Sequence, residues 1–390
     1  MTGRFKQIFS LAILVFGSFL VFNTTHAQQL VPDQITTMKA VVVEVTSAKR
    51  QNVPGTNVNS LDQMLQVKIL DGNEQGKEVS VENDYIELKA GDVVYLTHTV
   101  DSLESFDMYA VSDPYRLPWL YGLVGLFVLC VLIFGGKQGF RGLIALALSF
   151  VVIAYVLFPG ILHGFSPILM SIGVASLMII LGSYITHGFN RVTTSAVVGM
   201  VATIIFTGVL AYISIHGAKL TGFSSDESVY LNMNTNGTID FAGLLMGGIL
   251  IGLLGVLYDA AIGQAVAVDE LHHIGPHLPR TIIFKRALRI GREHIGALVN
   301  ILAIAYVGAS LPLLLLFYQS GADFALTVNR EIFATEIIRA MVGSIGLILA
   351  VPITTVIAIF FLMKKKEAVQ ADTTVVAGEM RKVEEFEHTH

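Results

Sequence analysis

The sequence predicts an α-helical polytopic membrane protein that carries a small extracytoplasmic all-β domain near its N-terminus. Hydrophobic residues make up 53% of the chain and charged residues only 14%, whereas soluble domains carry about a quarter charged residues. Short alternating segments fill residues 37–111, and long apolar runs follow them. The net charge of −5 gives no indication of nucleic-acid binding, so the lipid bilayer is the expected main partner.

Residues 1–27 read as a secretory signal peptide. Arg4 and Lys6 precede an apolar run over residues 8–22, and Ala27 ends a small-residue cleavage site. The alternative is an uncleaved anchor helix. The run is shorter than the ~20 residues that a spanning helix needs, which favours cleavage.

Residues 28–113 form the predicted extracytoplasmic domain. Five segments show period-two, β-branched patterning: 39–46, 63–70, 77–82, 92–99 and 106–111. Five short strands suit a small OB-like barrel. No ladder of aromatic and basic residues is present, so nucleic-acid binding by this barrel is not expected. A rigid cap that packs on the membrane domain is the simpler interpretation, and a ligand-sensing module is the alternative.

Residues 114–363 form the predicted transmembrane domain, with about seven helices. The apolar stretches are each close to the ~20 residues that cross ~30 Å of hydrocarbon. They lie near 118–136, 142–158, 167–185, 194–215, 240–258, 296–317 and 337–362. Residues 364–390, rich in Lys and Glu, are predicted to be a disordered tail.

The distribution of Lys and Arg predicts the orientation. If the β domain lies outside, the connectors around 137–141, 191 and 280–292 and the cluster 364–366 all face the cytoplasm. These segments hold most of the basic residues between the spans, as the positive-inside rule requires. The expected location is therefore a cytoplasmic (inner) membrane, with the N-terminal domain outside and the C-terminus in the cytoplasm.

One helix face combines glycines with acids. Residues on this face advance by steps of four and three: Gly248, Gly252, Gly255, Asp259, Gly263, Val266 and Glu270. The glycines predict close helix packing, and Asp259 predicts an ionisable site beside that seam. The alternative is that Asp259 ends the helix at the membrane interface, where water, Arg289 or Arg292 satisfies it.

The next apolar segment carries Asn300 more than one turn inside the predicted hydrocarbon. Its amide needs a partner there, and Asp259 or Tyr258 is a candidate. A polar contact that holds helices together explains Asn300 as well as a solute site does. Pro312 predicts a kink in the outer third of this segment.

The last helix carries charges near its start. Glu336 and Arg339 are spaced i, i+3 and are expected to pair, and Gly343 and Gly346 continue their face. Pro352 predicts a break near mid-depth. Broken helices at this depth line binding sites in transporters, although kinks also serve packing.

A histidine cluster offers the weakest of the candidate sites. His272, His273 and His277 lie near acids and are proper zinc ligands, but Gly275 and Pro276 interrupt the helix that would align them. A metal site is therefore not expected. No catalytic motif or cofactor fingerprint appears, and the single cysteine, Cys130, lies in an apolar run. The chain is not predicted to be an enzyme.

Three blocks, residues 255–271, 291–316 and 329–355, together resemble the YibE/F-like family of bacterial membrane proteins. The resemblance implies a multi-pass protein of unsettled biochemical function. The positions to which it points are Asp259, Glu270, Gly291, Asn300, Ala305, Tyr306, Gly308, Asn329, Glu331, Glu336, Arg339, Gly343, Gly346 and Pro352. Ala297 and Ile301 stand where the family pattern has threonines, which puts solute selectivity in doubt if those hydroxyls contact a solute.

Two functions follow as hypotheses. The first is a secondary transporter or permease that moves a small solute or ion along a polar path formed by Asp259, Glu270, Asn300, Glu336 and Arg339. The second is a non-transporting scaffold or sensor whose exported β domain binds a protein partner. Glycine-rich faces and proline kinks favour the first.

Overall fold

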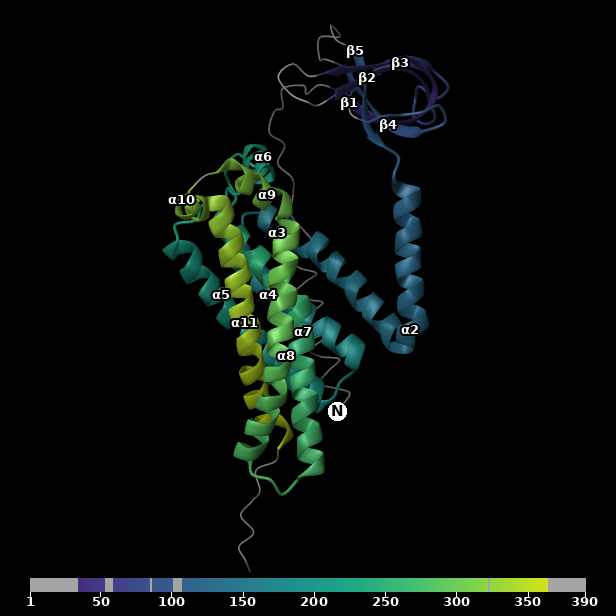
Figure 1. The fold of residues 1–390 in the computed structure, drawn as a ribbon. Helices are drawn as coiled ribbons and strands as arrows, with labels where there is room; N and C mark the ends of the chain where they lie inside the picture. Colours follow the sequence, from purple (N-terminus) through teal and green to yellow (C-terminus); the bar gives the residue numbers. More distant parts are fainter. Residues whose placement is uncertain (1–33, 53–58, 85, 101–106, 322, 364–390) are drawn as a thin grey trace, which may run out of the picture. The chain divides into compact units, whose positions relative to one another are not determined.

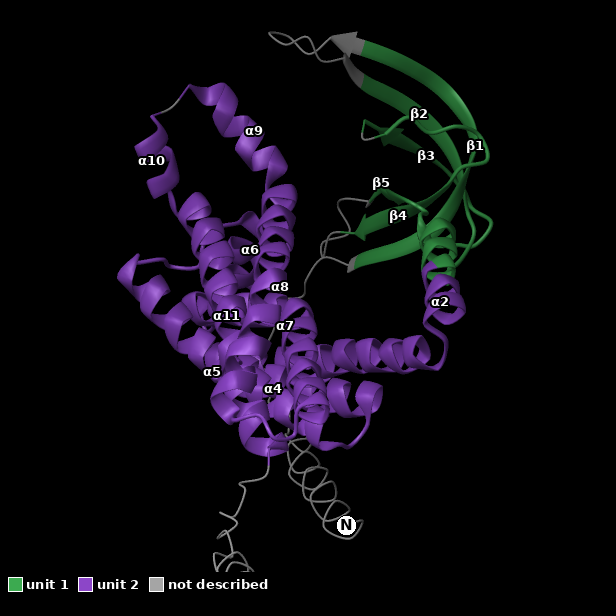
Figure 2. Cartoon of the chain, turned by 60° about the horizontal axis from the view of Figure 1, so that its bottom comes forward, with its two compact units in different colours: residues 1–126 green, residues 127–390 purple. Residues whose placement is uncertain are grey.

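The structure is a computed structural model, and it describes residues 34–52, 59–84, 86–100, 107–321 and 323–363. The predicted signal peptide and tail lie outside the described residues. Five strands come first and helices follow (Figure 1). The chain divides into two compact units, residues 1–126 and 127–390 (Figure 2).

The strands form one antiparallel sheet in the order β3-β2-β1-β4-β5. Their bounds are β1 (Gln34–Asn52), β2 (Asn59–Ile69), β3 (Glu78–Asn83), β4 (Val93–Val100) and β5 (Asp107–Pro114). The five predicted strands are therefore confirmed. β1 pairs with both β2 and β4, and its register with β2 shifts after Val42 and after Val45. Such bulges bend and twist a strand, so the sheet curls into a half-barrel whose edge strands β3 and β5 lie close together.

Alternation along the strands builds the core of this half-barrel. Ala40 and Val42 of β1, and Leu65, Val67 and Ile69 of β2, are all at most 1% exposed. Residues two apart on a strand point to the same face, so each of these strands turns one apolar row inward. The apolar face is long enough to give the sheet a core of its own.

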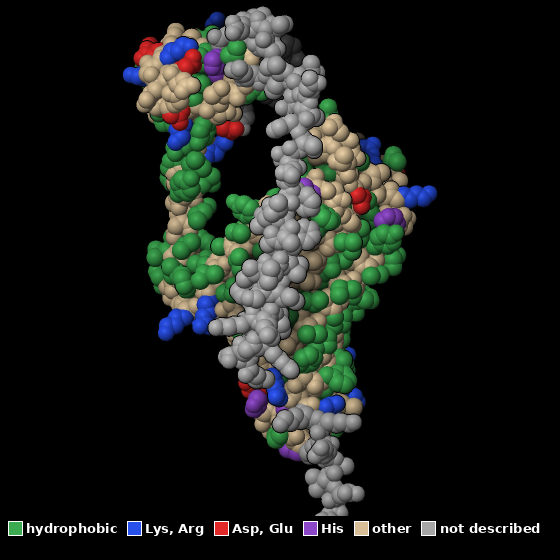
Figure 3. Space-filling model, turned by 180° about the vertical axis from the view of Figure 1, so that it is seen from behind, with side chains coloured by type: hydrophobic (Ala, Val, Ile, Leu, Met, Phe, Trp, Pro, Cys, Tyr) green, Lys and Arg blue, Asp and Glu red, His purple; other side chains and the backbone are tan. Residues whose placement is uncertain are grey.

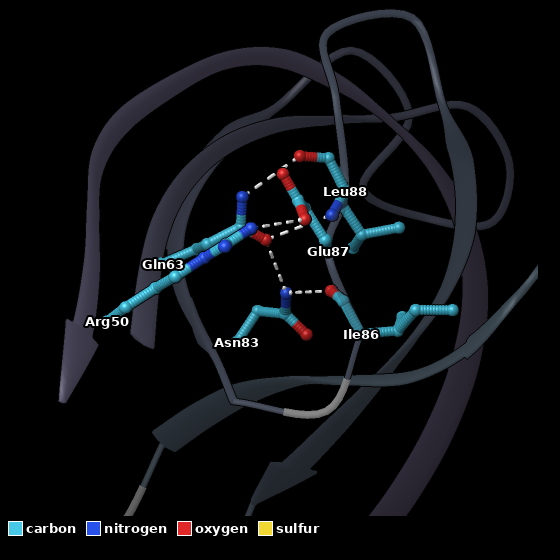
Figure 4. A network of polar contacts seen from close by, with 6 residues as sticks. All are labelled: Arg50, Gln63, Asn83, Ile86, Glu87 and Leu88. Carbon is cyan, nitrogen blue, oxygen red and sulfur yellow. Dashed lines mark hydrogen bonds and ion pairs between the residues drawn. The ribbon is translucent and has the colours of Figure 1, made fainter. Parts of the chain in front are cut away.

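A buried polar network ties the β3–β4 connection to β2 (Figure 4). The side-chain amide of Gln63 donates to the Leu88 carbonyl at 3.0 Å and accepts from the Leu88 N–H at 2.9 Å. Asn83 donates to Gln63 at 2.9 Å and to the Ile86 carbonyl at 2.7 Å. Because these buried amides are paired with the connection, Leu88 is held in the core at 4% exposure.

Side chains also join the two edges of the sheet. The Tyr109 hydroxyl of β5 donates to Glu74 at 2.6 Å and accepts from Lys77 at 2.8 Å, and His98 stacks on the Tyr109 ring. The hydrogen bond from Tyr109, followed by that from Lys77, holds the pKa of Glu74 below its ordinary value. We call Glu74, Lys77, His98 and Tyr109 the seam cluster.

The second part of the chain is helical. The helices are α2 (Leu117–Val152), η2 (Ile153–Leu157), α3 (Phe158–Leu162), α4 (Pro167–His187), α5 (Arg191–Gly217), α6 (Asp226–Asn234), α7 (Phe241–Ile274), α8 (Arg280–Ala309), α9 (Leu311–Ser320), α10 (Phe324–Asn329) and α11 (Glu331–Leu362). Six helices in the described residues are long and apolar enough to cross a membrane. This supports a multi-pass membrane protein.

The count of six differs from the seven predicted stretches. The first two stretches lie in one helix, Leu117–Leu162, of 46 residues. At about 1.5 Å per residue it is about twice as long as the hydrocarbon is thick. Its backbone leaves helical geometry at Gly136, where φ is 52°, and α2 bends there (Figure 1). A positive φ is available to glycine without a Cβ clash, which allows the bend at this residue.

α7 and α11 are central in the bundle: α11 contacts α5, α7 and α8, and α7 contacts α4, α5, α8 and α11. Small residues allow these close contacts. An added Cβ on Gly199 of α5 would meet Thr354 of α11, and one on Gly346 of α11 would meet Thr207 of α5. Figure 3 shows hydrophobic side chains along the helices and Lys, Arg and His side chains towards both ends of the helical part.

The two ends of the bundle are fixed by polar contacts. At the end where α11 begins, which we call the α6 end, Glu331 accepts hydrogen bonds from the Thr221 and Gly222 N–H groups, both at 2.8 Å. At the other end, which we call the Arg280 end, Arg280 donates to the Met363 carbonyl at 2.7 Å. The connector after α5 and the start of α8 are thereby joined to the two ends of α11.

The two predicted proline kinks have different outcomes. Pro312 lies in the first turn of α9, after α8 has ended at Ala309, so the predicted kink is a helix boundary. Pro352 lies inside α11, which continues to Leu362, so the helix is not interrupted there, and a kink at Pro352 stays a prediction. Helix neighbours on several sides hold this segment, and a membrane helix tolerates proline where its neighbours satisfy the freed backbone groups.

Candidate functional site

The glycine and acid residues of α7 lie on one exposed strip of an otherwise packed helix. The Asp240 side chain caps the start of α7 by accepting from the Gly243 N–H at 3.0 Å. The exposed residues at helical spacing are Gly248, Gly252, Gly255, Asp259, Gly263, Val266 and Glu270, which we call the α7 stripe. Residues between them, such as Leu253, Leu257 and Ala261, are fully buried. The faces beside the stripe are therefore packed against other helices, while the stripe is open.

The α7 stripe is smooth and long. An added Cβ on Gly248, Gly255 or Gly263 would meet no atom within 4 Å. From Gly248 to Glu270 the stripe spans about 33 Å at about 1.5 Å per residue, and it runs from inside the apolar segment 240–258 to beyond its end. Asp259 lies midway along it. α7 continues past Asp259 to Ile274, so the alternative that Asp259 ends the helix is wrong.

The acids of the stripe have no partner in the described part of the chain. Neither Asp259 nor Glu270 makes a hydrogen bond or ion pair with the described residues, and both side chains are exposed. The predicted link between Asp259 and Asn300 is not present among these residues either. The hydroxyl of Tyr258, the other candidate partner of Asn300, is buried beside Ser183 and Thr186, and among the described residues it makes no hydrogen bond to Asn300. An unpaired carboxylate in a spanning helix is costly unless water or another molecule reaches it.

A second polar group lies nearer the α6 end of the bundle. Glu336 and Arg339 of α11 pair at 3.5 Å, as their spacing predicted, and both are about one-third exposed or less. The Tyr306 ring of α8 lies within electrostatic range of both charges. The Tyr306 hydroxyl is also 3.1 Å from the position of an added Cβ on Gly252, so Tyr306 connects this pair to the α7 stripe.

This ion pair does not use all of its polar atoms. The Arg339 Nε is buried and has no hydrogen-bond partner among the described residues, and the same holds for the hydroxyls of Thr335 and Ser344 on the same helix. Buried polar groups are normally satisfied, so an unsatisfied donor indicates a place for water or solute. The group formed by Tyr306, Glu336 and Arg339 is called the α11 charge pair site below.

Asn300 does not join either group. α8 contacts the bundle through Gly291 and Leu302, and Asn300 is nine residues from Gly291, which is about half a turn round the helix. Asn300 is exposed and makes no hydrogen bond with the described residues. The structure thus brings Glu336 and Arg339 together near Gly252, and leaves Asn300 on a different surface.

A buried amide that the sequence analysis missed joins three helices. Gln264 of α7 is 3% exposed and donates to the Ala287 carbonyl of α8 at 2.9 Å and to the Thr355 hydroxyl of α11 at 2.7 Å. An added Cβ on Gly291 would meet both Gln264 and Val351. The sequence signal was an uncharged polar residue on the face opposite the glycines.

The remaining predicted glycines and the histidines have local roles. Gly343 packs on Leu302, with an added Cβ 3.1 Å from that side chain. His273 is exposed, and its Nδ1 donates to the Asp269 carbonyl at 2.9 Å. The Nδ1 of His272 is buried and has no hydrogen-bond partner among the described residues. The described residues contain no group of three His, Cys, Asp or Glu side chains that could hold a metal ion.

An open pocket lies at the α6 end. It has a volume of about 610 Å³, and Lys219, Asn329 and Glu331 supply polar side chains to its lining. Ala218, Lys219 and Leu220 line it from the connector after α5, opposite Asn329 and Glu331. The pocket therefore lies where the connector after α5 meets the start of α11.

The family follows from a comparison with protein-family models. The model described as YibE/F-like protein matches residues 123–364, which is more than half of the chain. The chain belongs to the YibE/F-like family. The match covers the helical part and does not include the β sheet. No curated protein and no solved structure matches the chain.

The structure shows the contacts of several residues to which the family resemblance pointed in this YibE/F-like protein. Gly291 allows α8 to approach Gln264, Tyr306 lies beside the α11 charge pair, and Glu331 holds the connector after α5. Ala297 and Ile301, which replace threonines of the family pattern, are both exposed on α8. A hydroxyl at those positions would thus not lie on the α7 stripe.

Proposed function

We propose that this YibE/F-like protein is a secondary transporter that moves a small solute or ion along the α7 stripe. The carrying observation is that this single open strip, on a helix that is otherwise buried, combines glycines with an unpaired carboxylate at its midpoint. Placing an ionisable residue inside a membrane costs free energy, so such residues usually either pair with another group or line a solute path. Asp259 has no partner in the described residues, which favours function.

The two ends of the stripe give this path a direction along the membrane normal. Glu270 lies at one end. Towards the other end, Tyr306 lies beside Gly252 and within electrostatic range of Glu336 and Arg339. Asp259 is about 16 Å from Glu270 along the helix, so the acids are too far apart to bind one ion together. A solute that moves along a path binds such separated sites one after another. The glycines leave backbone and space exposed for a solute.

The test is charge movement in proteoliposomes, with pH jumps, metal ions, amino acids and small anions applied in turn. Asp259→Asn and Glu336→Gln are the test variants, and Asp269→Asn is the matched control because Asp269 lies on α7 outside the stripe. We expect a solute-dependent current in wild type and in the control that is lost in Asp259→Asn. Normal flux in both test variants would refute the path.

We infer that the protein lies in a bacterial cytoplasmic membrane with its β domain outside and its C-terminus in the cytoplasm. The Lys and Arg bias supports this, together with two passes by the Leu117–Leu162 helix that turn at Gly136. Reporter fusions placed after residue 139 and after residue 363 test it. Both are expected to report the cytoplasm, and a difference between them would contradict the topology.

We also propose that the β domain is OB-like and that partner binding by this domain is the alternative function. Its five strands, the pairing of β1 with two neighbours and the approach of β3 to β5 support the OB-like description. Its separate core favours a domain that acts on its own. If a 28–113 fragment captures one defined protein from membrane extract while Asp259→Asn remains active in cells, the scaffold or sensor function replaces transport.

A further inference from the structure

α8 is packed less than the other single-pass helices. In its most apolar window only 11% of the residues are buried, against 33–50% for α4, α5, α7 and α11. Its mean hydropathy is also the lowest, at 1.3 compared with 2.2–2.7. A helix that is both polar and unpacked is unsuited to lipid on its open side.

One face of α8 holds most of this polarity. Its residues are all exposed and advance by four, three, four, four and three: Arg289, Glu293, Gly296, Asn300, Ile304 and Val307. We call them the α8 free face. Positions at this spacing line one side of a helix, and here that side is opposite Gly291 and Leu302, which contact the bundle.

The polar groups on this face have no partner within the described chain. Arg289, Glu293 and Asn300 make no hydrogen bond or ion pair with the described residues. Asn300 lies about 9 Å beyond His294 along the helix, inside a run without charged residues. Lipid tails cannot satisfy an amide, and each unsatisfied polar group in hydrocarbon costs several kcal/mol. The face therefore requires a polar or protein neighbour.

We propose that the α8 free face is the interface between two copies of this chain, related by a two-fold axis along the membrane normal. Around such an axis the same residue from each copy meets its equivalent, so Asn300 lies against Asn300 of the partner subunit. An amide has both donors and an acceptor, so two amides satisfy each other.

Size along the face allows close approach, and the charges alternate in sign. Around the axis Arg289 and Glu293 each meet their own equivalent, and the opposite charge of the other copy lies one turn away, about 6 Å along the helix. An added Cβ on Gly296 would meet nothing within 4 Å, so this position leaves room for close approach of a second helix. Asn300 then holds two copies together, and it is not part of the path along the α7 stripe.

The test is disulfide cross-linking in native membranes with the full chain. Cys130, the only cysteine, is first replaced by serine. Val307→Cys places a thiol on the α8 free face. Ala305→Cys is the matched control, since Ala305 is exposed on the same helix but lies about 140° from Asn300. We expect a species of twice the chain mass from Val307→Cys and not from Ala305→Cys.

Substitution of Asn300 separates this contact from a general packing defect. Asn300→Val is expected to weaken dimerisation about 5- to 30-fold, because interhelical amide bonds in membranes contribute about 1–2 kcal/mol in model peptides. Asn300→Gln keeps the amide and is expected to retain the cross-link. Absence of a dimer, cross-linking through Ala305→Cys, or an unchanged dimer in Asn300→Val would each overturn the proposal. None of these results depends on transport, so failure of either proposal leaves the other standing.

Discussion

The contact between Gly291 and its neighbours gives the sharpest prediction about how the helices are held together. Gly291→Ala adds one carbon where α8 meets α7 and α11. That carbon would lie 2.6 Å from Gln264 Oε1 and closer still to a Val351 methyl. Neither neighbour moves easily, since Gln264 is fixed by two hydrogen bonds and Val351 has a stiff side chain in a helix. The substitution is therefore expected to destabilise the bundle.

The magnitude follows from two opposing effects. Overpacking by one methyl in a filled core costs about 1–3 kcal/mol, and two rigid neighbours place this site in the upper part of that range. Replacing glycine by alanine in a helix contributes about 1 kcal/mol in the opposite direction. We expect a net loss of about 1–2 kcal/mol in the free energy of unfolding. Val351→Ala removes the methyl that the new carbon would meet, so the double variant should lose about 1 kcal/mol less than the sum of the single losses.

The assay is steric trapping in bicelles, which measures the free energy of unfolding of a membrane protein. Gly263→Ala is the matched control, because it lies next to Gln264 in the sequence but has open space at its Cβ. The control should be neutral or stabilised by up to about 1 kcal/mol. Equal stability of wild type and Gly291→Ala, or strict additivity with Val351→Ala, would refute this reasoning.

Two further predictions concern polar contacts outside the bundle core. Glu331→Gln removes the carboxylate charge that accepts hydrogen bonds from the backbone N–H groups of residues 221–222. We expect the local free energy of opening of this connector to fall by about 1.5–3 kcal/mol, and its amides to exchange faster in a hydrogen-exchange measurement. Unchanged exchange there would contradict the prediction. Glu74→Gln removes a carboxylate whose pKa is lowered by Tyr109 and Lys77. A carboxylate with a lowered pKa stabilises the folded state at pH values above the ordinary carboxyl pKa, and this contribution is lost as the pH falls through the folded pKa. Wild type should therefore resist proteolysis better than the variant at pH 7, and no better near pH 3. A difference that persists undiminished at pH 3 would argue against a titrating seam cluster.

The sequence predicted local patterns well because they depend on neighbours within one element. Five alternating segments became five strands, and apolar runs became helices long enough to span. The Glu336–Arg339 pair formed because i, i+3 residues on a helix are neighbours whatever surrounds them. The common face of Gly252, Asp259 and Glu270 follows from the same periodicity.

Periodicity could not show what each face meets. The glycines of α7 were expected in a packed seam, but the structure leaves Gly248 and Gly255 open and uses Gly291 and Gly346 for contact. Asn300 was expected near Asp259, yet it lies on the far side of α8. These outcomes depend on which helices become neighbours and how they are rotated. That is decided by the packing of the whole bundle.

By itself, the sequence determined the membrane class, the β domain ahead of the helices and the residues that share each face, because composition and helical spacing are local properties. Only the tertiary structure decided that α7 and α11 are central, that Gln264 joins three helices and that the faces carrying Asp259 and Asn300 stay open. The physical reason is that burial and pairing need a second surface. That second surface is formed by residues distant in the chain, and local sequence patterns do not show which of them come together.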